Sequence, residues 1–433
     1  MLSTENIKKL RDQYIGPSFS LSYHEPLHIV KGKGQFLYAS DGRQYLDAVN
    51  NISHVGHCHP RVIKALDEQN RLLNTNTRYL HDNIVTYADK LTNKLPAKLD
   101  VCYFTNSGSE SNDLALRMAR NYTDSNQTIV IAGAYHGHTN ATIEVSPYKF
   151  DGPGGAGSPN FVYQIPMPDP YRGKFRSNND DIALKYVDCV QQILDDLRED
   201  NKQVAAFIAE AILGCGGQIL FPEKFLAIAS KKVQQAGGLF IADEVQIGFG
   251  RVGSHFWGFE SENALPDIVT MGKSMGNGHP ISAVITTKEI ADRFNNGMEY
   301  FNSFGGNPVS CAVGKAVLQV IEEEKLQANA FQVGEYLMAQ LNDLKQRHNI
   351  IGDVRGRGLF LGLELIKDHE ELTPASLEAE KIANDMKDHG ILISTDGPDH
   401  NVLKIKPPMV FTKDNADQLV ETLNKLLMQG DFE

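Results

Sequence analysis

The chain carries a lysine directly after a short apolar stretch. Residues Ile268 to Met271 predict a buried strand that ends at Gly272, and Lys273 follows in a glycine-rich loop. Open α/β sheets bind their ligands at the carboxyl ends of their strands. A lysine amine, unlike an arginine, can form a Schiff base with a carbonyl compound. A lone Gly-Lys-Ser is more often a solvated loop, so other residues must decide between these interpretations.

A second group of polar residues joins a predicted strand, 101–105, to a predicted helix, 109–121. The connection contains Ser107, Gly108 and Ser109. Small residues at a helix start let a ligand approach free backbone N–H groups and the positive end of the helix dipole. This pattern is typical of a phosphate cradle, although it also fits a helix cap with no further role.

Three more groups follow predicted elements. Tyr135 and His136 come after the strand 128–132, where an aromatic ring could stack on a flat ligand or serve the core. Asp243 ends the apolar strand 239–242, and a buried carboxylate requires a partner, either a protonated ring nitrogen or an arginine. Ser303 begins a glycine-rich turn that ends at Pro308, and its simplest interpretation is a linker.

Together these groups match the needs of one cofactor, pyridoxal 5'-phosphate. It requires a phosphate cradle, a residue that stacks on its ring, an acid for its ring nitrogen and an amine for its aldehyde. The cofactor supplies the electron sink and the protein places it. We therefore interpret Lys273 as a functional lysine.

The elements around these residues predict an α/β fold. Apolar strands alternate with helices between residues 100 and 290, which favours a mostly parallel central sheet covered on both faces. The expected strands are 101–105, 128–132, 204–209, 239–242, 268–271 and 282–287, and the expected helices between them are 109–121, 181–199 and 223–236.

The two ends of the chain have a different character. Asp41-Gly42 predicts a hairpin near the N-terminus. Beyond residue 310, helices 309–323, 327–348, 376–389 and 413–428 and strands 358–365, 390–394 and 402–405 predict an α+β unit. The long stretch 150–179 is expected to be a lid or a mobile loop. We expect an N-terminal segment (1–59) that packs with the small domain, a large domain (60–310) and a C-terminal small domain (311–433).

Composition narrows the class of protein. The net charge of −12 gives no reason to expect a nucleic-acid partner. No apolar run approaches a membrane span, and the N-terminus shows no leader pattern. The five cysteines are scattered, as in a reducing cytosol, and His57-Cys58-His59 lacks further ligands, so we expect a cytoplasmic protein without a metal.

The chain resembles the class III aminotransferases of PLP fold type I over nearly its whole length. The resemblance is carried by Gly56-His-x-His-Pro60, Asn106-Ser-Gly-Ser-Glu110, Tyr135-His-Gly137, Asp243-Glu-Val-Gln-x-Gly-x-Gly-Arg251, Gly272-Lys273-x-x-Gly276, Phe304-Gly-Gly-Asn-Pro308, Val354-Arg-Gly-x-Gly358 and Pro407-Pro408.

The resemblance implies roles for individual residues. Lys273 would be the Schiff-base lysine, Asp243 the partner of the ring nitrogen, and Arg355 the ligand of a substrate carboxylate. Ser303 would reach the cofactor phosphate of the other subunit of a homodimer with shared active sites. The remaining residues expected around the cofactor are Ser107, Gly108, Ser109, Tyr135, His136, Glu210, Val245 and Gln246.

One departure from the family pattern concerns the reaction. Members that accept ω-amines commonly carry a glutamate that masks the carboxylate-binding arginine, within a motif like Glu-Pro-x-x-Gly-Glu. Here the stretch is Glu210-Ala-Ile-Leu-Gly-Cys215, and a neutral thiol cannot pair with a guanidinium. We therefore expect Arg355 to be unmasked, and a two-substrate transaminase cycle becomes doubtful.

Within the family the chain is most similar to the ethanolamine-phosphate and phosphohydroxylysine phospho-lyases. The matching stretches are 50–60, 73–83, 146–150, 300–306 and 394–398. Arg78, Arg355, Lys404 and Lys406 are candidates to bind a substrate phosphate. Two hypotheses stand: a lyase that eliminates phosphate from a phosphorylated amine, or a transaminase that moves an amine to pyruvate or 2-oxoglutarate.

Overall fold

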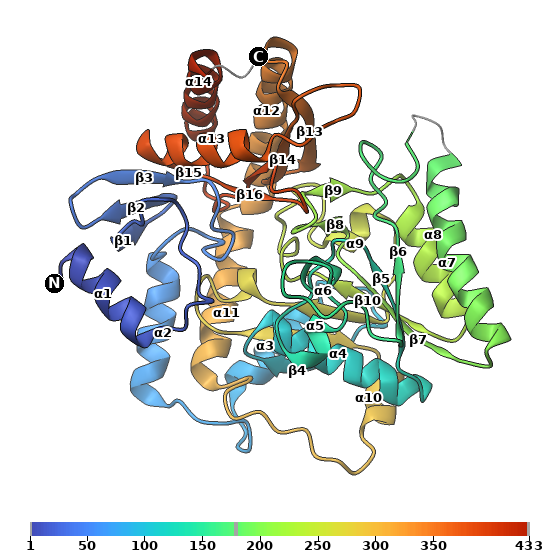
Figure 1. Ribbon diagram of the computed structural model, residues 1–433. Coiled ribbons are helices and arrows are strands. Elements are labelled where there is room, and N and C mark those ends of the chain that lie inside the picture. Colours follow the sequence, from blue (N-terminus) through green and yellow to red (C-terminus); the bar gives the residue numbers. More distant parts are fainter. Residues whose placement is uncertain (1, 177–180, 431–433) are drawn as a thin grey trace.

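A seven-stranded sheet forms the centre of the computed structural model, which describes residues 2–176 and 181–430 (Figure 1). Its strand order is β4-β12-β11-β10-β7-β5-β6, and only β12 runs antiparallel to its neighbours. The strands are β4 (Val101–Thr105), β5 (Gln127–Ile131), β6 (Val162–Ile165), β7 (Val204–Ala209), β10 (Leu239–Asp243), β11 (Ile268–Met271) and β12 (Ser282–Thr286). The expected α/β class with a mostly parallel sheet is confirmed.

Apolar residues on both faces of the strands explain why helices cover both sides. On β7, Phe207 packs into one apolar cluster, whereas its neighbours Ala206 and Ile208 pack into the other. Since alternate residues of a strand face opposite ways, each face requires a cover. The covering helices include α4 (Gly108–Thr123), α7 (Asp181–Glu199), α8 (Phe225–Gln235) and α10 (Lys288–Phe294).

The sequence left the direction of β12 open, and one expectation for this sheet was wrong. β12 is antiparallel because only the loop 272–281 separates it from β11, and parallel strands need a crossover of about a dozen residues or more. The stretch 150–176 is not a plain loop. It contains β6, which pairs with β5 at the edge of the sheet. The remainder of the expected loop, 177–179, lies outside the described residues.

A second sheet joins the two ends of the chain. The hairpin predicted at Asp41-Gly42 is formed by β2 (Phe36–Ala39) and β3 (Gln44–Asp47), which pair antiparallel, and β1 (Ile29–Lys33) pairs with the other edge of β2. β3 pairs in parallel with β15 (Ile391–Leu392) from near the C-terminus. The blue N-terminal strands therefore lie beside the red C-terminal segments in Figure 1.

The C-terminal part contains its own four-stranded sheet, in the order β13-β14-β17-β16. Its first strand was not expected from the sequence. The elements are β13 (Ile351–Arg357), β14 (Phe360–Leu365), β16 (Ser394–Asp396) and β17 (Val402–Ile405), with helices α11 (Pro308–Glu323), α12 (Leu326–Arg347), α13 (Ser376–Asp388) and α14 (Lys413–Gln429).

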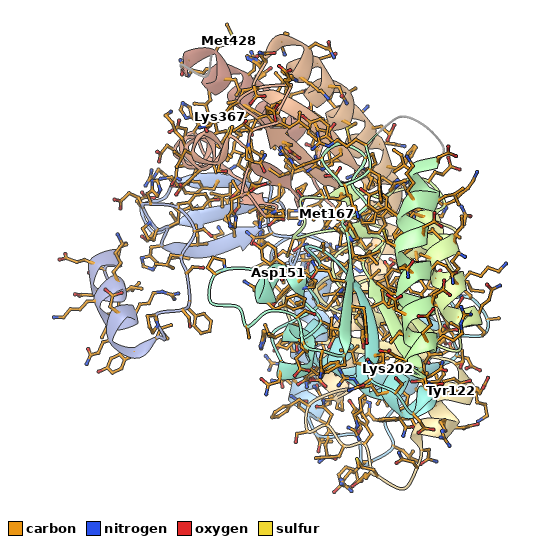
Figure 2. The ribbon with its side chains drawn as sticks, turned by 45° about the vertical axis from the view of Figure 1, so that its right-hand side comes forward. Tyr122, Asp151, Met167, Lys202, Lys367 and Met428 are labelled. Atoms are coloured by element: carbon orange, nitrogen blue, oxygen red, sulfur yellow. The ribbon has the colours of Figure 1, made fainter. Side chains whose placement is uncertain are left out.

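The remaining elements are short or peripheral. They are α1 (Thr4–Tyr14), α2 (Pro60–Leu72), α3 (Asp82–Thr92), α5 (Asn140–Ile143), α6 (Pro147–Phe150), α9 (Gly258–Ser261), β8 (Ile212–Leu213), β9 (Ile219–Leu220) and the 3-10 turn Lys273–Met275. Helix α1 has no buried residue and stands at the side of the molecule in Figure 2. Among the described residues, no helix is long and apolar enough to cross a membrane.

Candidate active site

A cavity of about 370 Å³ opens at the carboxyl ends of β4, β5, β10 and β11. The residues that line it come from loops far apart in the sequence, as expected at this edge of an α/β sheet. Ten residues expected from the sequence line the cavity: Ser107, Gly108, Ser109, Tyr135, His136, Glu210, Asp243, Val245, Gln246 and Lys273.

Asp243 is fixed in the floor of this cavity by hydrogen bonds. Its Oδ2 accepts from Asn112 Nδ2 at 2.8 Å and lies 2.7 Å from His136 Nδ1. Its Oδ1 accepts from the backbone N–H of Val245. Asn112 in turn accepts from the Thr270 hydroxyl at 2.6 Å. The carboxylate is therefore buried but held in one orientation by three polar groups, one of which is fixed in turn by Thr270.

The start of α4 forms a concave backbone surface. Ser107 caps the helix, because its Oγ accepts from the N–H of Glu110. A Cβ on Gly108 would lie 2.7 Å from Val245 Cγ1, so a larger residue there would displace the loop. Gly137 has a φ of +138°, and a Cβ there would meet Ser109 Oγ at 2.7 Å. Glycine is thus required at residue 108 for the close approach to Val245 and at residue 137 for the close approach to Ser109.

Lys273 and Glu210 both line the cavity, and the charge of each acts on the other. Burial lowers the pKa of Lys273. Burial and then the nearby Asp243 raise the pKa of Glu210 to about 8. Glu210 Oε1 accepts from the N–H of Gly214 at 3.3 Å and from Gln246 Nε2 at 3.5 Å, whereas its Oε2 is buried without a partner. Burial thus favours the neutral form of both groups.

Lys406 does not line the cavity, but it lies close to it. Its Nζ pairs with Asp396 at 2.9 Å, and Lys404 pairs with the other oxygen of the same carboxylate at 2.9 Å. The positive charge of Lys406 acts on both Glu210 and Cys215. Burial raises the pKa of the Cys215 thiol to about 11, so this thiol is neutral at physiological pH.

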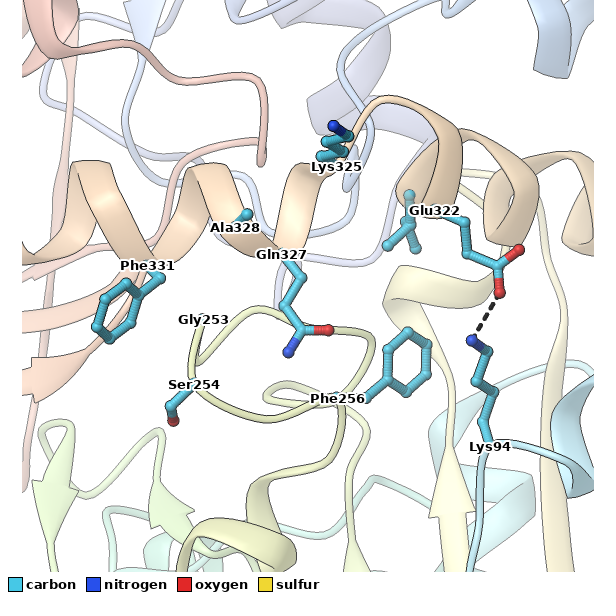
Figure 3. A pocket seen from close by; sticks show the side chains of 10 residues that line it. Lys94, Gly253, Ser254, Phe256, Glu322, Lys325, Gln327, Ala328 and Phe331 are labelled. Atoms are coloured by element: carbon cyan, nitrogen blue, oxygen red, sulfur yellow. Dashed lines mark ion pairs between the residues drawn. The ribbon is translucent and has the colours of Figure 1, made fainter.

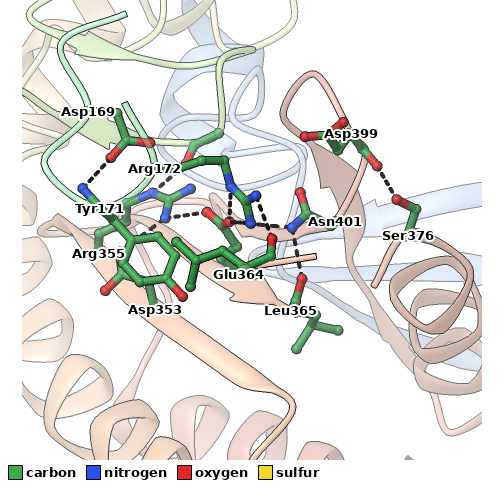
Figure 4. Close-up of polar contacts among 12 residues, drawn as sticks. Asp169, Tyr171, Arg172, Asp353, Arg355, Glu364, Leu365, Ser376, Asp399 and Asn401 are labelled. Atoms are coloured by element: carbon green, nitrogen blue, oxygen red, sulfur yellow. Dashed lines mark hydrogen bonds and ion pairs between the residues drawn. The ribbon is translucent and has the colours of Figure 1, made fainter. Parts of the chain in front are cut away.

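The expectation that Arg355 is unmasked was wrong. Its Nη1 lies 2.7 Å from Glu364 Oε2 and 3.0 Å from Asp353 Oδ2, and its Nε donates to the Gly217 carbonyl at 2.8 Å (Figure 4). Arg172 pairs with the same Glu364. Strand pairing explains this, because Asp353 faces Glu364 across β13 and β14 and lies on the same side of its strand as Arg355.

Two other predicted residues also lie away from the cavity. Arg78 pairs with Glu299 at 3.1 Å and packs on the ring of Phe301, with its guanidinium 4.5 Å from the ring centre. Ser303 is exposed in the same region, and the structure does not bring it to the cavity of its own chain.

A larger cavity, of about 600 Å³, lies elsewhere and contains none of the predicted residues. It is bordered by Phe256, Phe331 and the ion pair between Lys94 and Glu322, whose charged atoms are 2.7 Å apart (Figure 3). Size therefore does not identify the active site; the arrangement of acid, amine and helix start does.

Comparison with known proteins agrees with this arrangement. The model of the family "Aminotransferase class-III" matches residues 19–427. The chain belongs to the class III aminotransferase family. An alanine–glyoxylate aminotransferase 2-like protein of Drosophila melanogaster is 50% identical over 96% of this chain and 85% of its own. An ethanolamine-phosphate phospho-lyase homolog of Caenorhabditis elegans is 42% identical over 98% of this chain and 94% of its own.

A solved structure is similar over the whole length. It is a phospholyase from Arthrobacter in complex with phosphoethanolamine, with a TM-score of 0.93 and 38% sequence identity, and the match covers 98% of this chain and 100% of that one. Together with the family, this likeness identifies the protein as a PLP-dependent enzyme and confirms PLP fold type I.

The site of this class III enzyme fits pyridoxal phosphate. The concave start of α4, with glycines where a Cβ would collide, offers N–H groups to a phosphate. Asp243 offers an acceptor to a protonated ring nitrogen, and Lys273 offers the amine. The unpartnered Oε2 of Glu210 remains available to a polar group inside the cavity.

Sequence reasoning missed two residues, one that lines the cavity and one that packs behind its wall. Asn112 lies in α4, and its sequence position indicates only a polar helix residue. Its Nδ2 nevertheless donates to both Asp243 and the carbonyl of His136. Tyr148 packs edge-on against Tyr135, with ring centres 6.4 Å apart. The stretch 146–150 had matched the phospho-lyases, and this was the available signal for Tyr148.

Proposed function

We propose that this enzyme is a phospho-lyase that eliminates phosphate from a phosphorylated primary amine such as O-phosphoethanolamine. The observation that carries the proposal is Cys215, which lies near Lys273 where transaminases of the family that accept ω-amines commonly place a masking glutamate. Its raised pKa of about 11 keeps it neutral, so it cannot alternate with a substrate carboxylate in binding an arginine.

The state of Arg355 supports the same reaction. A transaminase has to release an arginine for the carboxylate of its keto acid in every cycle. Here Arg355 is buried and paired with both Glu364 and Asp353. To bind a keto acid, Arg355 would have to leave both carboxylates, and breaking a buried ion pair costs about 3 to 5 kcal/mol. A lyase does not need this exchange.

The residues of the cavity have clear tasks in such an elimination. Pyridoxal phosphate, when bound, supplies an aldehyde for the substrate amine and a ring that accepts negative charge. Lys273 takes a proton from the carbon that carries the amine, since its lowered pKa favours the neutral base. Asp243 holds a proton on the ring nitrogen. The C–O bond on the next carbon then breaks, phosphate leaves with the bonding electrons, and water completes the conversion to an aldehyde and ammonia.

The alternative is a transaminase, which the Drosophila melanogaster relative favours by its name and its 50% identity. Both reactions share the first proton transfer, so Lys273 and Asp243 do not distinguish them. The difference lies in whether a keto acid is consumed.

The deciding experiment is an incubation of the holoenzyme with O-phosphoethanolamine and no keto acid. We expect release of phosphate, ammonia and an aldehyde in equal amounts, and no release from the Lys273→Ala variant. Cys215→Ser should keep the reaction, because the hydroxyl is also neutral, whereas Cys215→Glu should slow it by placing an anion near the departing phosphate. Formation of alanine or glutamate from added pyruvate or 2-oxoglutarate, with phosphate retained on carbon, would establish the transaminase.

We also propose a homodimer with shared active sites. Exposed apolar residues gather on two segments joined by the ion pair of Arg78 and Glu299. We call this the Leu80 surface; it consists of Leu72, Leu73, Tyr79, Leu80, Val85, Met298, Phe301 and Phe304. Large exposed apolar surfaces are typical of protein interfaces. Ser303 lies within it, as expected of a residue that serves the neighbouring subunit.

A further inference from the structure

The cations expected to bind a substrate phosphate already have carboxylate partners. Arg355 pairs with Glu364 and Asp353, and Arg78 pairs with Glu299. Lys404 and Lys406 share Asp396. A phosphate dianion placed beside any of these groups also meets a carboxylate, and like charges at close range disfavour binding.

Lys149 differs from these cations. No carboxylate within residues 2–176 and 181–430 forms an ion pair with it, and its side chain is exposed. Its contacts are with two aromatic rings: the ammonium lies 5.2 Å from the ring centre of Tyr148 and 5.9 Å from that of Tyr135. These rings hold the ammonium in place without neutralising its charge.

The position of Lys149 is set by the end of α6. Pro147 starts this short helix, and Lys149 lies in its last turn. The helix is anchored by the N–H of Tyr148, which donates to the carbonyl of Ala134 at 3.0 Å, immediately before Tyr135. Since Tyr135 lines the cavity, the ammonium of Lys149 is tied through two contacts to the cavity wall.

Tyr135, which contacts Lys149, lines the same cavity as Lys273. The thiol of Cys215 is close enough to influence Tyr135, Tyr148 and Lys273 alike. In O-phosphoethanolamine only two carbons separate the amine from the phosphate ester, a span of roughly 5 Å at ordinary bond lengths. Lysine has a flexible four-carbon stem and three donors, which suits it to meet a phosphate at that distance.

We propose that Lys149 binds the phosphate of the substrate, with the rings of Tyr135 and Tyr148 as its support. This assignment rests on the proposed phospho-lyase function and adds a specificity residue to it. Lys404 and Lys406 remain paired with Asp396 outside the cavity lining. The phosphate accepts hydrogen bonds from an ammonium that has no carboxylate to release first.

The test compares three variants of the holoenzyme with the wild type. Lys149→Met removes the charge and keeps the length of the side chain, and Lys149→Arg keeps the charge. Lys174→Met is the matched control, because Lys174 is also exposed and also lies over an aromatic ring, 5.3 Å from the centre of Phe175, but Phe175, unlike Tyr135, does not line the cavity. Phosphate release gives kcat and KM for O-phosphoethanolamine, and inorganic phosphate serves as a competing ligand.

We expect Lys149→Met to raise both KM and the inhibition constant of inorganic phosphate by about 10- to 100-fold, the usual effect of losing a hydrogen bond between charged groups. The KM and the inhibition constant of Lys149→Arg should stay within about threefold of the wild-type values. In Lys149→Met, kcat should change less than KM, because Lys273 performs the proton transfer from carbon. Lys174→Met should match the wild type.

The outcomes separate this assignment from the function itself. If the wild type releases phosphate and Lys149→Met binds substrate and inorganic phosphate like Lys174→Met, the assignment of Lys149 is wrong and the lyase stands. If the wild type only transaminates, the lyase is wrong. In that case, competition by inorganic phosphate is compared between the wild type and Lys149→Met. Weaker competition in the variant supports the anion site, and equal competition overturns the site as well.

Discussion

Glu210 shows how burial sets the proton balance at the level of single residues. Burial disfavours the charged form of both Glu210 and Lys273, so the pKa of the acid rises and that of the amine falls. The lowered pKa of Lys273 favours the neutral amine. This is the property that a base acting on a carbon acid requires.

Glu210 should make the cofactor-free protein less stable as pH rises. Its pKa is about 8 in the folded chain and 4.5 ordinarily, so between these values the folded state keeps a proton that the unfolded state has lost. Stability therefore declines across this window, whereas Lys273, with its lowered pKa, acts in the opposite direction at higher pH. Glu210→Gln removes the carboxyl group and with it this loss of stability as the pH rises.

Thermal unfolding of the wild type and Glu210→Gln at several pH values checks this. The melting temperature of the variant relative to that of the wild type should increase from about pH 5 to about pH 8. A constant difference over that range would mean that Glu210 keeps its ordinary pKa in the fold.

At the level of elements, Glu364 connects parts of the chain that the sequence keeps apart. It lies on β14 and is shared by Arg355 on β13 and by Arg172 from the segment after β6. Arg172 also donates to the carbonyl of Leu372 at 2.6 Å. The segment that was expected to be a lid is thus tied to the C-terminal sheet (Figure 4).

Glu364→Ala should destabilise the protein by about 3 to 5 kcal/mol, because it leaves two guanidinium groups at a buried position without their shared anion. The matched control is Glu370→Ala, since Glu370 is exposed in the loop that follows β14. Chemical denaturation of both variants provides the measurement. Equal stability of the two would show that the buried pair contributes nothing.

The sequence predicted those elements and residues whose signal is local. Apolar runs identified the central strands, because both faces of the sheet are buried, and the polar residues at their ends identified Asp243 and Lys273. Pairing between strands carries no such signal. The register that places Glu364 opposite Asp353, and so beside Arg355, exists only after β13 and β14 have met. The antiparallel direction of β12 was missed because strand composition does not indicate direction, whereas the length of the preceding loop does.

At the level of the whole molecule, the Leu80 surface predicts the oligomeric state. Leu80→Asp and Phe304→Asp should each produce monomers with little activity, since a charge in an apolar interface is costly and Ser303 would no longer reach a second site. Leu377→Asp is the control, because Leu377 is also an exposed apolar residue but lies on α13. Light scattering combined with the phosphate assay measures both effects, and a wild type that is monomeric and fully active would contradict the proposal.

The pairing of the two chain ends has a consequence for synthesis. The Tyr23 hydroxyl donates to the carbonyl of Ile393, which is 370 residues further along the chain. At about 5 to 20 residues per second, the ribosome needs roughly 20 to 70 seconds to deliver that partner. Throughout this interval β3 presents an unpaired edge, because β15 has not yet been made. The first strands of the nascent chain are therefore a natural target for chaperones, and ribosome-bound fragments that end before Ile391 should leave them sensitive to proteases.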